Sequence, residues 1–332
     1  MEDILLYMAP MEGVTGYIYR RAYHRCFYPL DRYFTPFIAP KQAGAAVPEN
    51  RTISISARER RDILPDHNRG MKVVPQILTN RWEDFLQTCG ILKEAGYREV
   101  NLNLGCPSGT VTAKKKGAGF LGEPVLLEDF LLRVSCGLEK MGMELSVKTR
   151  LGVEEPEEFK RLLRIYNQVP LKELIVHPRV LKDYYGNKPR LEWFGVALSD
   201  SRAPVCYNGD IFSKEDMEAL MERFFPGRAC GSSGRVMLGR GLIRNPGLAG
   251  ELAGQKPAAV EDFRRFHNLL WQDYLEAMGE ERNALFKMKE IWSYMQELFN
   301  ADGRLMKKLK KSRNGPEYLE AVGQIFETGL KI

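Results

Sequence analysis

Short apolar runs recur at a regular spacing through about the first 240 residues, and this pattern restricts the possible folds more than any other feature of the chain. Most of the runs are separated by segments with the periodicity of an amphipathic helix. The predicted strands are residues 5–9, 32–36, 73–77, 99–103, 145–149, 173–176, 204–208 and 235–239. The clearest predicted helices are residues 82–95, 126–140, 156–167, 191–199 and 214–224.

Eight strands that alternate with helices, about 30 residues apart, are typical of a (β/α)8 TIM barrel, which is an α/β fold. The alternative is a doubly wound open sheet, which is built from the same alternation of strands and helices. The connection at 41–71 is longer than its counterparts and is predicted to be rich in loops.

The pattern changes after Pro257, where strand signals stop and only helical periodicity remains. Apolar residues recur at helical spacing from 285 to 299, which is typical of a helix that packs one apolar stripe. Short breaks near residues 300 and 315 divide the segment into three or four helices. We therefore predict a TIM-barrel catalytic domain over residues 1–255 and a small all-α helical domain over residues 256–332.

The composition excludes several classes of protein. The chain of 332 residues is 44% hydrophobic and 28% charged, which are ordinary globular values and exclude a disordered chain or a coiled coil. The six cysteines form neither a CxxC pair nor a zinc-binding spacing with histidine, so no metal site is predicted. The N-terminus lacks a signal-peptide pattern, and no run of about 20 apolar residues is present. We expect a cytoplasmic monomer that does not enter a membrane.

The predicted strands end in residues with reactive or hydrogen-bonding side chains, or in glycine. In a TIM barrel the active site lies at the carboxyl ends of the strands, so these residues should meet at one rim. Their joint placement there predicts an active site more strongly than any one of them does. In strand order they are Ala9, Pro10 and Met11; Gln76; Asn103 and Cys106; Lys148 and Arg150; His177 and Arg179; Asn208, Gly209 and Asp210; and Gly239 and Arg240.

The loops after the seventh and eighth predicted strands indicate a phosphate site. Residues 208–210 and 239–240 offer free backbone N–H groups and a guanidinium at the position where many barrels bind phosphate. The alternative is a pair of ordinary glycine turns. Amide side chains suit a flat heteroaromatic ring, and Lys148 and His177 would place positive charge beside a ring that becomes anionic on reduction. Together these features predict FMN as the cofactor.

The same segments resemble the dihydrouridine synthase family, flavoenzymes that reduce uridine in transfer RNA. The most specific similarity is the Asn-x-Gly-Cys-Pro element at 103–107, which is followed by Lys114-Lys115-Lys116-Gly117-Ala118-Gly119. The other similar segments, which follow the family's order over about 240 residues, are 9–15, 147–150, 177–179, 208–210 and 237–246. The resemblance also implies a helical C-terminal domain that helps to hold RNA.

The resemblance implies a redox cycle in which NADPH reduces FMN, the flavin delivers hydride to C6 of a uracil, and a cysteine protonates C5. By position, Cys106 is the proton donor. A thiol with an ordinary pKa near 8.5 is mostly protonated at neutral pH and suits this role. A thiolate nucleophile, which needs a lowered pKa, is the alternative reading of Cys106.

The resemblance also implies roles for the other site residues. Asn103 would orient the uracil or the flavin ring. Gln76, Lys148 and His177 would contact the isoalloxazine, together with the first loop of Ala9, Pro10 and Met11. The ribityl phosphate would lie on Asn208, Gly209, Asp210, Gly239 and Arg240, and the substrate would contact Arg150, Arg179 and Tyr185.

Several positions depart from the family's usual pattern. Val180, Leu181 and Asp183 stand where members commonly have other polar residues, although Tyr185 keeps an aromatic ring. Pro36 and Phe37 replace a common acidic residue, and Gly16 stands where Asp is frequent. These positions lie where the substrate nucleotide is expected, so the target uridine is left open.

The charge distribution bears on an RNA partner. The formal net charge is +6, yet residues 258–332 hold 12 Lys and Arg and 12 Asp and Glu, so the excess lies in residues 1–257. Within the neutral tail a basic stretch without acidic residues is formed by Arg304, Lys307, Lys308, Lys310, Lys311 and Arg313. This stretch and Lys114, Lys115 and Lys116 are predicted to contact RNA; a solvated helical face is the alternative.

Three hypotheses follow from the sequence. The first is an FMN-dependent enzyme that makes dihydrouridine in transfer RNA with NADPH as reductant. The second is the same chemistry on ribosomal RNA, or on a small pyrimidine or enone. The third is an RNA-binding barrel without catalysis.

Overall fold

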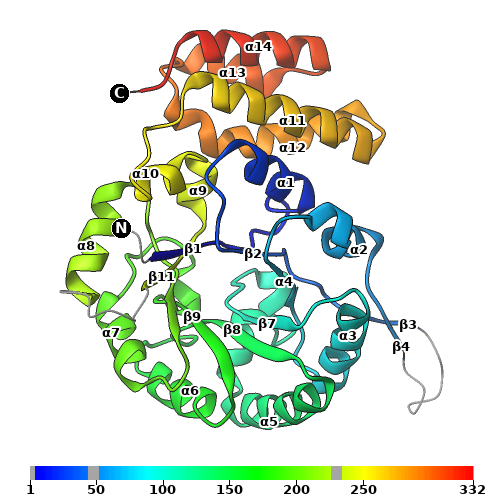
Figure 1. The fold of residues 1–332 in the computed structure, drawn as a ribbon, viewed down its shortest axis with the longest axis vertical. Coiled ribbons are helices and arrows are strands. Elements are labelled where there is room, and N and C mark those ends of the chain that lie inside the picture. The colour runs from blue at the N-terminus through cyan, green and yellow to red at the C-terminus, as the bar shows by residue number, and fades with distance from the viewer. Residues whose placement is uncertain (1–3, 44–51, 226–233, 332) are drawn as a thin grey trace.

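The structure, a computed structural model, describes residues 4–43, 52–225 and 234–331. Its central feature is a parallel sheet that closes on itself, with helices around it (Figure 1). The strand order in the sheet is β5-β2-β1-β11-β10-β9-β8-β7-β6, and β5 and β6 are consecutive along the chain. The strands are β1 Ile4–Met8, β2 Arg32–Phe34, β5 Val73–Val74, β6 Gln76–Ile77, β7 Glu99–Leu104, β8 Glu144–Arg150, β9 Leu171–His177, β10 Val205–Tyr207 and β11 Gly234–Leu238.

The closed sheet confirms the predicted TIM barrel and excludes the doubly wound alternative. One detail differs, because the single strand predicted at 73–77 is split into β5 and β6. Pro75 stands between them and has no N–H to donate to the ladder. Its carbonyl still accepts a hydrogen bond from the backbone N–H of Asn101, at 2.9 Å, so the barrel continues past the interruption.

The helices predicted between the strands are present, with ends that move by two residues or fewer. They are α3 Trp82–Glu94, α5 Pro124–Met141, α6 Glu158–Tyr166, α7 Leu191–Asp200 and α8 Lys214–Phe224. A further helix, α1 Tyr17–Cys26, was not among the predicted ones. Its arginines and histidine interrupt the apolar pattern in the sequence, but Arg20 is buried with the apolar side chains.

The prediction of a loop-rich connection at 41–71 is wrong for most of the part that the structure describes. The segment contains an antiparallel ribbon of β3 Lys41–Ala43 and β4 Thr52–Ser54, then helix α2 Ala57–Ile63 and a 3-10 turn at Pro65–Asn68. Helix α2 starts in a capping box, in which Ser56 and Glu59 satisfy each other's backbone N–H groups. Residues 44–51 of this connection lie outside the described part.

The helical segment that begins after residue 255 packs onto the barrel, with α11 against α1 and α12 against α9, a short helix that directly follows β11 (Figure 1). Tyr19 of α1 meets Phe266 edge to face at 5.4 Å, and Arg21 pairs with Asp273 at 2.8 Å. Lys287 donates from Nζ to the carbonyl of Gly13 at 2.8 Å, which ties this segment to the first loop of the barrel. The helices after β11 are α9 Arg240–Arg244, α10 Leu248–Leu252, α11 Val260–Met278, α12 Glu281–Met295, α13 Gly303–Lys311 and α14 Gly315–Glu327.

The barrel interior is filled below the strand ends. Tyr7, Phe34, Ile175 and Met237 form a buried cluster there, and the hydroxyl of Tyr7 donates to the Glu173 carboxylate at 2.9 Å. The interior is therefore packed rather than a pore, and an opening remains only above this floor. Among the described helices, none is long and apolar enough to cross a lipid bilayer.

Candidate active site

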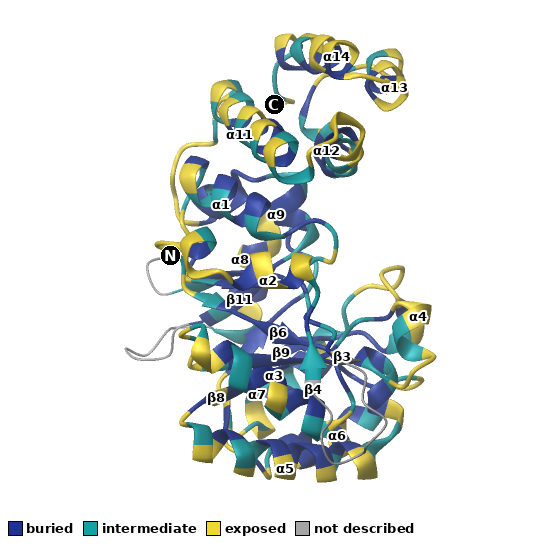
Figure 2. Ribbon diagram, turned by 90° about the vertical axis from the view of Figure 1, so that its right-hand side faces the viewer, coloured by how far each residue is buried: buried dark blue, intermediate teal, exposed yellow. Residues whose placement is uncertain are grey.

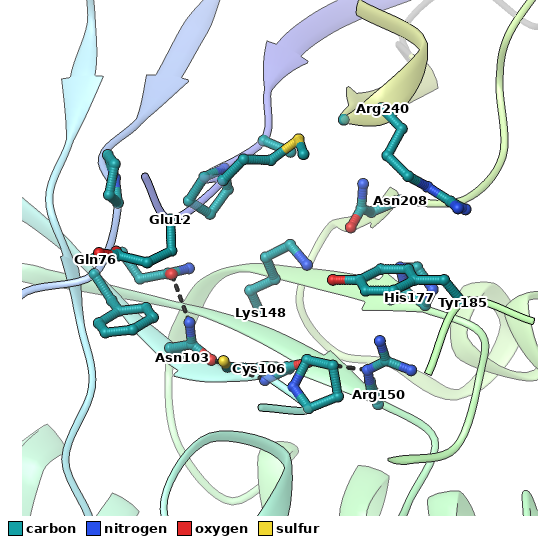
Figure 3. Close-up of a pocket in the computed structure, with 18 of the residues that line it drawn as sticks. Glu12, Gln76, Asn103, Cys106, Lys148, Arg150, His177, Tyr185, Asn208 and Arg240 are labelled. Atoms are coloured by element: carbon teal, nitrogen blue, oxygen red, sulfur yellow. Dashed lines mark hydrogen bonds between the residues drawn. The ribbon is translucent and has the colours of Figure 1, made fainter. Parts of the chain in front are cut away.

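A cavity of about 340 Å³ opens at the carboxyl ends of the barrel strands (Figure 3). Its wall combines most of the residues that the sequence predicted for one rim with two that were not predicted, Glu12 and Tyr294. Gln76, Asn103 and Cys106 lie on one side, and His177, Tyr185, Asn208 and Arg240 lie on the other, with Lys148 between them (Figure 3). The lining residues are Ala9, Pro10, Met11, Glu12, Pro36, Phe37, Gln76, Asn103, Gly105, Cys106, Pro107, Lys148, Arg150, His177, Tyr185, Asn208, Gly209, Asp210, Gly239, Arg240 and Tyr294.

A network of amide side chains holds Cys106 in place. The Oδ1 atom of Asn103 accepts hydrogen bonds from the backbone N–H groups of Gly105 and Cys106, at 3.0 and 2.9 Å. The amide of Asn103 in turn donates to Oε1 of Gln76 at 2.7 Å, and Gln76 donates to Oδ1 of Asn101 at 2.7 Å. Asn103 thus fixes the turn that carries the thiol, and its remaining hydrogen-bonding capacity is small.

Burial is the main influence on the pKa of Cys106. Burial raises the pKa of the Cys106 thiol above its ordinary value, although Lys148 and a backbone hydrogen bond at Ser108 act in the opposite direction. Glu12, on the first loop, adds to the rise. This balance favours a proton donor over a thiolate nucleophile, which were the two readings that the sequence left open.

Lys148 is the cation at the centre of the cavity. It belongs to β8, and none of the described residues forms an ion pair or a hydrogen bond with its ammonium group. Burial and the neighbouring charge of Arg150 lower the pKa of Lys148 to about 8. The group is therefore mostly cationic at pH 7 and is available to a ligand.

His177 is neutral, which corrects the expectation that it supplies positive charge. Burial and the nearby cations Arg150, Lys148 and Arg179 hold the pKa of His177 well below its ordinary value. Arg179 lies 3.1 Å from the Nε2 atom of His177, and a guanidinium can only donate. The proton of the neutral ring is therefore on Nδ1, which makes His177 a hydrogen-bond donor at that atom.

Arg179 does not line the cavity but supports it from behind. Its side chain is 1% exposed, and it pairs with the Asp210 carboxylate at 2.5 Å. Asp210 also pairs with Arg240 at 2.5 Å, and the Arg240 guanidinium lies 4.9 Å from the centre of the Tyr185 ring. The Asp210 carboxylate therefore orients the Arg240 side chain and is not itself a binding group for an anion.

Arg150 lines the cavity, but its guanidinium is largely used by the protein. It donates to the carbonyls of Gly105, Val180 and Tyr184 at 2.9 to 3.0 Å. These bonds join the loop of Cys106 to the loop after β9. Arg150 therefore fixes the relative position of two loops that border the cavity.

Two lining residues were not found from the sequence. Glu12 follows Met11 directly, so its place beside the first strand was a usable signal; it forms an ion pair with Arg58 of α2 at 2.5 Å. Tyr294 comes from α12, whose sequence shows only the periodicity of a packed helix. Its place in the cavity depends on how the helical segment docks onto the barrel, which no local pattern specifies.

The predicted lysine clusters lie outside the cavity. Lys114, Lys115 and Lys116 follow the short helix α4 Gly109–Thr112, and Lys115 pairs with Glu123 at 2.5 Å. Lys307, Lys308, Lys310 and Lys311 lie on α13, where Lys308 pairs with Glu320 at 2.6 Å. Helices α4 and α13 are on the same side of the molecule (Figure 2). Among the described residues, no group of three or more His, Cys, Asp or Glu could hold a metal ion.

Two of the positions that depart from the usual family pattern, Asp183 and Gly16, have a clear local structural role. Asp183 caps its own turn through the backbone N–H of Val180 at 2.9 Å and pairs with Arg190. Although burial opposes it, hydrogen bonds from Arg190 and Asn187 lower the pKa of Asp183 to about 2. At Gly16 the missing carboxylate is replaced from α2, because Asp62 accepts the first N–H of α1, that of Tyr17, at 2.6 Å.

Comparison with known proteins agrees with this geometry. A family model described as dihydrouridine synthase matches residues 7–327. A probable tRNA-dihydrouridine synthase of Staphylococcus aureus is 30% identical over 276 residues, which are 80% of this chain and 77% of that protein. The tRNA-dihydrouridine(16) synthase of Pseudomonas putida is 26% identical over 82% of this chain and 79% of its own.

Solved structures support the fold. The histamine dehydrogenase of Rhizobium sp. 4-9 is 11% identical and superposes with a TM-score of 0.53, covering 89% of this chain and 51% of that one. At this level of identity, the likeness concerns the barrel architecture alone.

Proposed function

Since the chain belongs to the dihydrouridine synthase family, we propose that it reduces the C5–C6 double bond of a uridine in transfer RNA to dihydrouridine. One observation carries the proposal: the cavity holds the half-buried Cys106 thiol, whose turn is fixed by Asn103, beside the cation of Lys148. A proton donor and a cation next to space for a ring are what a reductase of a uracil needs.

FMN fits the residues that line the cavity. Gln76 and Lys148 would hold the ring, and the first loop of Ala9, Pro10 and Met11 would pack against it. When bound, FMN supplies the hydride for C6 of the uracil after reduction by NADPH, the reductant that the resemblance implies. His177, as a neutral donor at Nδ1, would hydrogen-bond the ring rather than stabilise its charge.

The phosphate end of FMN is proposed for the loops after β10 and β11. Arg240 supplies the guanidinium, and the backbone of Gly209, Asp210 and Gly239 supplies N–H groups. The expectation that Asn208 offers a free backbone N–H is wrong, because this group donates to the carbonyl of Val176 at 2.9 Å. Gly209 is required in this loop, since a Cβ atom there would overlap the hydroxyl of Tyr207. The Asp210 carboxylate acts by holding Arg240 in place.

Cys106 is proposed to protonate C5 of the uracil. The raised pKa of the thiol keeps the proton on sulfur until the ring accepts it, and Asn103 keeps the sulfur aimed at the cavity. Arg150 contributes by holding the loop of Cys106 against the loop of Tyr185.

RNA is proposed to lie across the mouth of the cavity and the helical segment over residues 256–332. Helix α4, which the first lysines follow, and helix α13, which carries the others, lie on one side of the molecule, which supports a common phosphate-binding surface (Figure 2). Taking the uridine out of a stacked loop would bring it into the cavity.

A transfer-RNA substrate also fits the expected cytoplasmic location. A single chain that supplies all of these groups fits the expected monomer.

The test is a map of dihydrouridine in total RNA from a strain that lacks this protein. We expect dihydrouridine to disappear from one or a few positions of transfer RNA and to return when the gene is restored. Loss from ribosomal RNA alone would overturn the choice of substrate. An unchanged map in both RNA classes would overturn the proposed reaction on RNA.

A further inference from the structure

A second cavity, of about 240 Å³, lies beside the catalytic one and has no part in the proposed chemistry. It is enclosed by the first loop and α1 of the barrel, by α2, and by α11 and α12 of the helical segment, which are neighbours in Figure 1. Pro36 lines both cavities. The ion pair between Glu12, in the catalytic cavity, and Arg58, in the second one, spans the partition between them.

Two polar side chains that line the second cavity, Asp62 and Tyr274, each keep an oxygen atom to which no described residue hydrogen-bonds. Asp62 is 5% exposed; its Oδ1 accepts from the backbone of Tyr17, but none of the described residues donates a hydrogen bond to its Oδ2. Tyr274 is 5% exposed, and its hydroxyl has no hydrogen bond within the described ranges. Neither of these two oxygens is sealed inside the protein, so both are available to a polar ligand in the cavity.

The remaining wall specifies the chemistry of that ligand. The ring of Tyr17 lines the cavity and is stacked on His67 at 4.1 Å, which holds it as a fixed flat surface. Arg58, Arg61 and Lys287 add three cations to the lining. Arg58 is also paired with Glu12, and Lys287 with Glu290. Aromatic surfaces with nearby cations are how proteins hold an unstacked base and its phosphate, and a free carboxylate oxygen accepts from a base amine.

The departure at Gly16 helps to form this site. A Cβ atom at Gly16 would lie 3.3 Å from Oδ1 of Asp62, so a longer side chain there would compete with the carboxylate for the same space. Glycine at this position leaves Asp62 facing the cavity while it caps α1.

We propose that the second cavity binds a base of the same RNA that neighbours the target uridine, and that this base carries an exocyclic amine, which donates to Asp62. This inference rests on the proposed function. The protein would then recognise two nucleotides of one RNA. The uridine would be recognised in the catalytic cavity, and a neighbouring guanine, adenine or cytosine would be recognised by a hydrogen bond to Asp62. The shared wall at Pro36 puts the two cavities close enough for nearby nucleotides of one strand.

The protein-side test fills the cavity with Ala277→Trp on α11, and the matched control is Gln272→Trp, an exposed position of the same helix. We expect the kcat/KM for dihydrouridine formation in RNA to fall about ten-fold or more in the first variant and to stay unchanged in the control. NADPH oxidation without RNA should be the same in both variants. Activity of Ala277→Trp within about two-fold of the wild type would overturn the inference. A defect in NADPH oxidation instead would assign the cavity to the reductant.

An RNA-side test uses the unaltered protein, so it does not depend on how the variant folds. Each amine-bearing nucleotide near the target is replaced by its analogue without the amine: inosine for guanosine, purine riboside for adenosine, and zebularine for cytidine. One position should lose about ten-fold in kcat/KM, and Asp62→Asn should reduce the difference. Equal rates for every analogue would refute the inference. If the unaltered protein formed no dihydrouridine in any RNA, the proposed function itself would have failed.

Discussion

Replacing Cys106 with alanine separates the two halves of the proposed reaction. The change removes only the sulfur, because the turn is held through its backbone N–H groups by Asn103, at 3.0 and 2.9 Å, and these bonds remain. The cofactor contacts proposed for Gln76, Lys148 and Arg240 are also untouched. A positioned general acid contributes roughly 10²- to 10⁴-fold in rate, so the barrier to uridine reduction should rise by about 3 to 5 kcal/mol.

The assay measures each half-reaction alone. NADPH oxidation by the holoenzyme in the absence of RNA should keep its wild-type rate in Cys106→Ala. Formation of dihydrouridine by the pre-reduced enzyme, mixed with transfer RNA without oxygen, should slow by the factor above. Cys136→Ala, at an exposed position of α5, is the matched control and should change neither rate.

The pH dependence distinguishes an acid from a nucleophile. Because burial raises the pKa of the Cys106 thiol, the proton remains on sulfur through neutral pH, and the rate of uridine reduction should fall only at alkaline pH. A thiolate mechanism requires the opposite slope, a rate that increases with pH. An increasing profile, or dihydrouridine formation by Cys106→Ala at the wild-type rate, would refute the proton-donor role.

Three further results are expected. Lys148→Met should weaken FMN binding, and the wild-type affinity should decline as pH increases through about 8, where the Lys148 ammonium loses its proton. A denaturant titration should show that Gly209→Ala costs about 2 kcal/mol or more of unfolding free energy, because its Cβ overlaps the hydroxyl of the buried Tyr207. Lys310→Ala combined with Lys311→Ala should weaken RNA binding and reduce the salt slope, log Kd against log salt, by about 1.5 to 2 if both contact phosphate; an unchanged slope would exclude them from the interface.

The barrel could be predicted because its signal is periodic and local. Each strand shows in the sequence as an apolar run, and parallel strands connected by helices have few arrangements. The sequence-based predictions of secondary structure were wrong where one or two residues changed the local backbone structure. Pro75 splits a strand, and the capping box of Ser56 and Glu59 starts a helix in a segment that looked like loop; both signals were present in the sequence.

The sequence predicted which residues come together at the site, but it did not predict the contacts that each side chain makes there. Fifteen of the predicted residues line one cavity, because strand order places them at one rim. Arg179 was expected at the substrate and instead lies behind His177, where it adds to the burial and to the charges of Arg150 and Lys148 that lower the pKa of the ring. Whether an arginine faces a ligand or a neighbouring histidine is decided by side-chain packing. The alternation of strands and helices in the sequence does not predict this packing.

The departures from the family pattern can be understood as one connected change on the substrate side. Asp62 takes over the cap that Gly16 cannot provide, and this also brings a carboxylate to the cavity between the barrel and the helical segment. Asp183 likewise builds its own turn after β9, and Arg150 ties that turn to the loop of Cys106. The strand ends that hold Cys106 and Lys148 are unaffected by both changes. We propose that α2 and the turn after β9 take part in target choice, together with Pro36 and Phe37, which line the catalytic cavity itself.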